Sequence, residues 1–132
     1  MDILTQGVLG AAAVQASVTD TKKITVAGGC GFLAGMAPDL DVLILSQSDP
    51  LMFLEYHRHF THALAFIPFG GFICALCLYG LGRERWQLNF LYILLCCNIG
   101  YATHGLLDAS TSYGTSLFWP FSETRVSWGL VS

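Results

Sequence analysis

Two long apolar stretches, separated by a short charged break, constrain the fold of this chain most strongly. They run over residues 63–82 and 86–103, and the charged residues between them are Arg83, Glu84 and Arg85. At a rise of about 1.5 Å per residue, each stretch forms a helix long enough to cross roughly the 30 Å hydrocarbon core of a bilayer. We therefore predict an antiparallel pair of membrane-spanning helices with the charged break at its tip.

The composition of the chain points to the same class of protein. Apolar residues make up 54% of the 132 residues and charged residues only 11%, whereas soluble domains carry about 25% charged residues. A soluble helical domain would have to bury nearly all of both long stretches, so we favour an integral membrane protein. The net charge is −3 and the longest basic run is Lys22-Lys23, which argues against a nucleic-acid partner.

Two shorter apolar segments, residues 3–18 and 24–37, complete the predicted fold: a single all-α domain over residues 1–132 with about four apolar segments. Both segments are rich in glycine and alanine, which let membrane helices approach one another closely. Gly31 and Gly35 have the GxxxG spacing, which we attribute to packing within the subunit rather than to a dimer face. The acidic Asp2 argues against a cleavable signal peptide.

The five cysteines all fall within the apolar segments, where a free thiol behaves as a small hydrophobic group. Cys74 and Cys77 have the CxxC spacing, but they lack the βαβ context of a redox site. We predict packing cysteines and no disulfide framework.

The charged breaks suggest an orientation in the membrane. If every segment crosses, Lys22-Lys23 and Arg83–Arg85 lie on one face, which the positive-inside rule makes cytoplasmic. Arg58 falls on the opposite face and is the charge that counts against this orientation. The Trp119-Pro120-Phe121 stretch and Trp128 suit an aromatic belt at a membrane interface.

Acidic residues and a histidine flank the apolar segments on that opposite face. His104 and Asp108 are four apart, so a helix presents them on one side, where they can share a cation or a hydrogen bond. Asp39 and Asp41 follow Pro38 at the end of the second segment. Two interpretations stay open for them: a solvated helix cap, or a pair of carboxylates that share a cation.

Three histidines precede the third segment and offer nitrogen ligands. His57 and His62 are five apart and converge only in a bent conformation, whereas His59 and His62 are three apart. The alternative is a set of interfacial histidines with their polar tips in water. Arg58 has two roles open to it, as a snorkelling anchor or as a counter-charge for a phosphate-like group.

The predicted hairpin would return His62 and His104 to the same membrane face, beside the acidic residues. Imidazole and carboxylate together are the ligand set of zinc, manganese or iron sites, whereas magnesium prefers oxygen ligands alone. Ionisable residues at membrane depth are also candidates for a functional site by default. The sequence therefore predicts a metal site at this face.

The ordered set of motifs resembles the LexA-regulated, membrane-bound, predicted metal-dependent hydrolase family. The motifs that carry the resemblance are Met1-Asp2 with Thr5, Pro38-Asp39-Leu40-Asp41, His57-Arg58-x-x-Thr61-His62, His104-x-x-x-Asp108, Thr111-x-Tyr113-Gly114 and Trp119-Pro120-Phe121-Ser122. The resemblance implies a bacterial inner-membrane hydrolase. The metal ligands that it implies are Asp39, Asp41, His57, His62, His104 and Asp108.

The chain departs from the family pattern at three positions and in its length. Gln6 stands where the family usually has histidine, and a glutamine carbonyl is a poorer zinc ligand. His59 stands where the family has glycine, so it is a candidate substitute ligand, and Ala63 stands where serine is common. Members often continue into further membrane helices, so we expect a short or truncated member.

These observations predict a multi-pass protein that binds one or two divalent metal ions, zinc or manganese being favoured, and hydrolyses an ester or phosphoester. Membrane lipids would surround it, and a lipid-linked substrate would suit its position. His57 would act as a ligand or general base, and Arg58 would stabilise developing negative charge. The rival hypothesis is a non-enzymatic protein that uses the cluster for ion binding, transport or assembly. An open coordination position would favour the hydrolase, because structural metal sites are closed.

Overall fold

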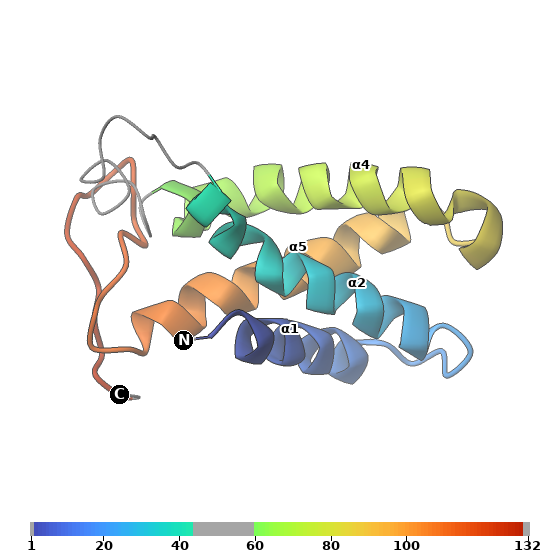
Figure 1. The fold of residues 1–132 in the computed structure, drawn as a ribbon, viewed down its shortest axis with the longest axis horizontal. Coiled ribbons are helices and arrows are strands. Elements are labelled where there is room, and N and C mark those ends of the chain that lie inside the picture. The colour runs from blue at the N-terminus through green and yellow to red at the C-terminus, as the bar shows by residue number, and fades with distance from the viewer. Residues whose placement is uncertain (1, 44–59, 131–132) are drawn as a thin grey trace.

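A computed structural model of the protein describes residues 2–43 and 60–130, and these residues fold into an all-helical structure (Figure 1). The α-helices are α1 (Ile3–Ser17), α2 (Ile24–Met36), α4 (Ile67–Trp86) and α5 (Phe90–Ala109). Three short 3-10 helices connect them: η1 (Ala37–Leu43), η2 (Phe60–His62) and η3 (Leu64–Phe66). The predicted all-α class with four principal helices is confirmed. An isolated antiparallel bridge pairs Thr115 with Val126.

The predicted helical hairpin is confirmed in α4 and α5, but its turn lies further along the chain than expected. Helix α4 continues through Arg83–Arg85, and residues 87–89 form the turn. Gln87 ends α4 in the left-handed region, with φ 48°. The Asn89 side chain then accepts a hydrogen bond of 2.8 Å from the Tyr92 backbone N–H, and thus caps α5. These local caps set the boundaries, because arginine and glutamate are compatible with a helical turn.

Glycines allow α1, α2 and α5 to meet backbone to backbone. A Cβ added at Gly10 would lie 2.4 Å from the Gly31 carbonyl oxygen, and one added at Gly100 would lie 2.5 Å from the same atom. A Cβ at Gly35 would lie 2.7 Å from the carbonyl oxygen of Gln6. The GxxxG pair therefore packs within the subunit, as predicted.

The cysteines add to this interior without forming disulfides. All five are free thiols, as predicted, and Cys30, Cys96 and Cys97 are buried in the core. Cys77 is exposed on α4, so not every cysteine is a core residue.

The outer surfaces of the helices suit a lipid environment. Helices α4 and α5 are both long and apolar enough to cross a membrane. Large apolar side chains on them point outward, with Phe69 67% exposed and Leu91 63% exposed. Such exposure over long helices is costly in water and favourable in lipid.

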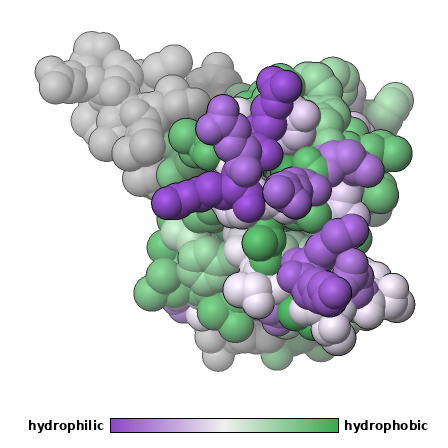
Figure 2. All heavy atoms as spheres, turned by 90° about the vertical axis from the view of Figure 1, so that its right-hand side faces the viewer, coloured by the Kyte–Doolittle hydropathy of each residue, from purple (hydrophilic) through white to green (hydrophobic). Residues whose placement is uncertain are grey.

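The polar end of the bundle carries both charged breaks. Figure 1 shows the α1–α2 connection and the α4–α5 turn at the same end, and Figure 2 shows hydrophilic side chains gathered there. Lys22, Lys23, Arg83 and Arg85 are all exposed. The two breaks share one end, as expected. The assignment of that end to the cytoplasm stays a prediction.

The segment 110–130 lies at the opposite end and is fixed to the helices by backbone hydrogen bonds. Leu64 N–H donates to Leu117 O at 2.9 Å, and Trp128 N–H donates to Ala109 O at 2.9 Å. Phe121 is 91% exposed and Trp128 is 53% exposed. Their placement at this end is compatible with the predicted interfacial belt, which stays a prediction.

Candidate metal centre

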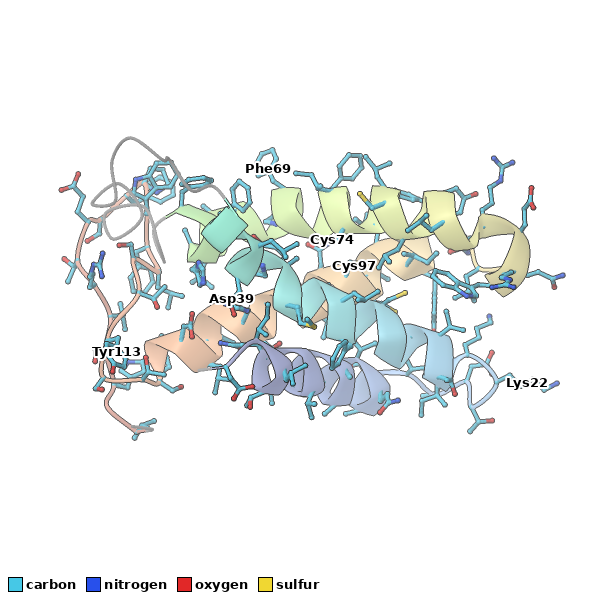
Figure 3. The ribbon with its side chains drawn as sticks, viewed as in Figure 1. Lys22, Asp39, Phe69, Cys74, Cys97 and Tyr113 are labelled. Atoms are coloured by element: carbon cyan, nitrogen blue, oxygen red, sulfur yellow. The ribbon has the colours of Figure 1, made fainter. Side chains whose placement is uncertain are left out.

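Four side chains from three separate elements converge at the end of the bundle opposite the basic breaks. Asp39 comes from η1, His62 from η2, and His104 and Asp108 from α5. One ligand atom from each lies within 4.8 Å of the others. Both histidines and Asp108 are buried, while the Asp39 side chain is 15% exposed. Figure 3 shows Asp39 between the end of α2 and α5.

Local structure explains how α5 receives the η2 histidine. His104 and Asp108 are one helical turn apart and share the inward face of α5. Gly105, between them, allows η2 to approach, since a Cβ there would lie 2.8 Å from the His62 carbonyl oxygen. The Tyr101 hydroxyl, also on α5, donates to the Thr61 carbonyl oxygen at 2.8 Å and holds the η2 backbone.

The distances suit a cation of ordinary size. His62 Nε2 lies 2.9 Å from His104 Nε2, and Asp108 Oδ2 lies 3.2 Å and 3.4 Å from these two nitrogens. Asp39 Oδ1 lies 3.7 Å and 3.3 Å from the same two atoms. Metal bonds of 2.0–2.2 Å in a tetrahedron separate the ligands by about 3.3–3.6 Å. The cluster could therefore accept a zinc-type ion with shifts of a few tenths of an ångström to about 1 Å.

Both histidines turn Nε2 inward because Nδ1 has an outer partner. His104 Nδ1 lies 2.6 Å from the Gly35 carbonyl oxygen, which can only accept, so Nδ1 carries a proton, and Nε2 is the nitrogen that would offer its lone pair to a bound metal. His62 Nδ1 lies 2.9 Å from the Thr61 hydroxyl oxygen. Metal-binding histidines in proteins characteristically have such partners on the second nitrogen.

A bound cation would balance the negative charge of the two carboxyl groups in the cluster. Burial raises the pKa of the Asp39 carboxyl, but hydrogen bonds to His104 and His62 outweigh it and hold that pKa below its usual range. The partly exposed Asp39 is thus kept as an ionised carboxylate, in the same cluster as the buried carboxyl group of Asp108. Two ionised carboxylates held this close together repel unless a positive charge lies between them. One divalent ion would balance both.

Gln6 completes the inner wall of the cluster. The Asp2 side chain caps α1 by accepting from the Thr5 N–H at 2.9 Å, and Gln6 follows on the first turn of that helix. Its Nε2 donates to Asp108 Oδ1 at 2.8 Å. The Oε1 of the same amide is buried and has no hydrogen-bond partner within the described part of the chain. A buried acceptor without a donor is costly, so a cation or its water would suit this atom.

Gln6 is the residue that the sequence suggested as a poorer zinc ligand than histidine. Its amide orients the Asp108 carboxylate from the outside, and reversing the amide would bring two oxygens together. The residues present fit a divalent metal ion, with Gln6 as a supporting group.

The structure describes only part of the predicted site. It brings together Asp39, His62, His104 and Asp108. Asp39 lies inside η1 and faces the histidines, so the capping interpretation does not apply to it. Asp41 also lies in η1, but its side chain is outside the described part. His57, Arg58 and His59 lie outside the described residues altogether, and their roles stay predictions.

Sequence reasoning missed two supporting groups. The Gly35 carbonyl belongs to the GxxxG pair, which the sequence suggested only as a packing motif. Thr61 was part of the family motif, but adjacency to His62 alone does not reveal that its hydroxyl contacts Nδ1. The signal available in the sequence was the position of Thr61 directly before a candidate ligand.

Comparison with known proteins agrees with the membrane character of the fold. The family model described as YdjM inner membrane protein matches residues 1–132. The chain belongs to this family. It is also 32% identical over 101 residues to the uncharacterized protein YfhP of Bacillus subtilis (strain 168). The match covers 76% of this chain but 30% of YfhP, so the chain spans less than a third of that relative's length. No solved structure matches the chain.

Proposed function

We propose that the protein is a multi-pass, membrane-bound, metal-dependent hydrolase of an ester or phosphoester. The observation that carries the proposal is the convergence of two imidazole nitrogens and two carboxylates at one end of apolar helices. Membership of an inner membrane family supports the location. The resemblance to the LexA-regulated hydrolase family supports the reaction class.

The residues of the cluster have distinct parts in this chemistry. When bound, a divalent cation supplies an acidified water and polarises the scissile carbonyl or phosphoryl group. His62, His104 and Asp108 would hold it from the buried side, and Asp39 from the side that is partly exposed. We assign entry of substrate to the Asp39 side, because the other three ligands are enclosed by protein.

The reaction itself is a simple hydrolysis. The water oxygen forms a bond to the carbonyl carbon or phosphorus, the bond from that atom to the alcohol oxygen breaks, and the alcohol oxygen takes up a proton. We assign to His57 the role of further ligand or general base, and to Arg58 the stabilisation of negative charge on the reacting group.

Asp108→Asn is expected to abolish hydrolysis of phospholipid esters by the protein in detergent with zinc or manganese. Asparagine keeps the shape of the side chain and can still accept from Gln6, but it lacks the negative charge that a metal requires. We expect a loss of at least about 100-fold in kcat/KM, the scale of a lost electrostatic contact at a reacting centre. The amount of hydrolysis product formed is measured by chromatography of the lipids.

The matched control is Asp20→Asn, which removes a carboxylate at the opposite end of the bundle, where Asp20 pairs with Lys23 at 3.5 Å. Its activity should equal that of the wild type. Equal activity of Asp108→Asn and wild type would refute the hydrolase proposal.

One observation favours a non-enzymatic alternative. His62, His104 and Asp108 are each 1% exposed or less, as in a closed structural site. A protein that binds zinc through these residues but cleaves no ester or phosphoester would support a role in ion binding, transport or assembly instead.

A further inference from the structure

An apolar groove lies between α2, η1, α4 and α5. Its volume is about 480 Å³, within the range of roughly 300–1,000 Å³ that ligand pockets occupy. The wall that α4 provides is one stripe of residues spaced three and four apart: Gly70, Ile73, Cys74, Cys77 and Leu78. Such a stripe normally packs into a core. Here the side chains of Cys74 and Cys77 are too small to fill the space, so the groove stays open along this stripe, which covers about 12 Å of helix.

One end of the groove lies beside the metal centre. Pro38 and Thr61 line it, and each directly precedes a residue of the cluster, Asp39 or His62. Tyr101 forms the floor at this end. Its ring packs so closely on α4 that a Cβ added at Gly70 would lie 2.3 Å from the ring. The groove therefore ends beside the chain segments that carry Asp39 and His62, although the four ligand residues themselves are not among its lining residues.

The groove is also continuous with the surface that faces lipid. Among its lining residues, Leu33 is 49% exposed, Leu40 is 53% exposed and Ile73 is 56% exposed. These side chains join the outward apolar faces of α2, η1 and α4, and α4 is long and apolar enough to cross a membrane. A hydrated or charged molecule would lose its water at this depth without compensation. A hydrocarbon chain has no favourable hydration to lose, so it can occupy the groove without this cost.

We infer that this groove binds one hydrocarbon chain of a membrane lipid and places the lipid's ester or phosphoester beside Asp39, the partly exposed residue of the cluster. The second half of this inference rests on the proposed function. The first half, binding of the chain, does not. The substrate would then be a lipid whose chain enters between α2 and α4 while its polar group lies at the metal centre.

The test is the retention of lipid by variants that place tryptophan on two sides of α4. Figure 3 shows Cys74 projecting from α4 toward the bundle and Phe69 projecting away from it. The protein is reconstituted in vesicles of phosphatidylethanolamine and phosphatidylglycerol, extracted in mild detergent and analysed by native mass spectrometry. We expect one lipid per wild-type chain, the same for Phe69→Trp, and about tenfold less retained lipid for Cys74→Trp, because overpacking excludes the chain.

A second variant, Cys77→Trp, fills the groove from an exposed position on α4. It keeps the test valid if Cys74→Trp does not fold. Metal content, measured on the same samples, should be equal in all of them. Equal lipid retention by the groove variants and Phe69→Trp, or a wild type that retains metal but no lipid, would overturn the inference and leave the hydrolase proposal standing. Groove-dependent retention of lipid without hydrolysis of any ester would support chain binding and defeat the proposed function.

Discussion

The double variant His104→Ala/Asp108→Ala is expected to lose divalent metal when purified in detergent, whereas the wild type retains about one ion per chain. Loss of an outer partner of a metal ligand weakens binding about 10- to 100-fold. Removal of two direct ligands should exceed that range, so we expect zinc affinity to fall more than about 100-fold. Metal content by mass spectrometry and competition with a chelator give the two readings.

The control for this experiment is Asp20→Asn, whose carboxylate lies at the other end of the bundle. Helical content by circular dichroism shows whether the double variant has folded, since the loss of His104 also removes its contact with the Gly35 carbonyl. A folded double variant with undiminished zinc would contradict the assignment of these ligands.

Gly31→Leu is expected to destabilise the fold by about 3 kcal/mol or more, at the upper end of the range for overpacked interiors. A Cβ at Gly31 would lie 2.5 Å from the Val14 side chain and 2.6 Å from the Gly10 carbonyl oxygen. Neither a short branched side chain nor a helix backbone can move aside without separating α1 from α2. Thermal unfolding in detergent, followed by circular dichroism, measures the change.

Gly29→Leu provides a close comparison for this variant. Gly29 lies on the same helix two residues earlier, and a Cβ there meets nothing within 4 Å. Its melting temperature should stay within a few degrees of the wild type, because surface substitutions usually change stability by about 0.5 kcal/mol or less. Equal melting temperatures for the two variants would show that the contact at Gly31 does not hold the helices together.

Much of the fold was accessible from the sequence because apolar length and helix rise are simple constraints. Two stretches long enough to cross a bilayer, joined by a short break, leave few arrangements other than a helical hairpin. The exact start and end of each helix were harder to predict from the sequence. The cap at Asn89 and the continuation of α5 past His104 depend on local hydrogen bonds and on burial against other helices.

The candidate site was accessible only in part. The four-residue spacing of His104 and Asp108 fixes their relative position on a helix, so that pair followed directly from the sequence. The approach of η2 did not, since it depends on the missing side chain of Gly105. Likewise, Gln6 and Asp108 are 102 positions apart, and only the packing of α1 on α5 brings them within 2.8 Å.

X-ray absorption spectroscopy of the zinc-loaded protein measures directly whether Asp39, His62, His104 and Asp108 bind one divalent ion. We expect nitrogen and oxygen neighbours at about 2.0–2.2 Å, with the outer scattering of two imidazole rings. That outer scattering should fall in His104→Ala. Sulfur neighbours at about 2.3 Å would instead place the metal on the cysteines and contradict the assignment of these four ligands. A protein that retains no zinc would contradict it as well.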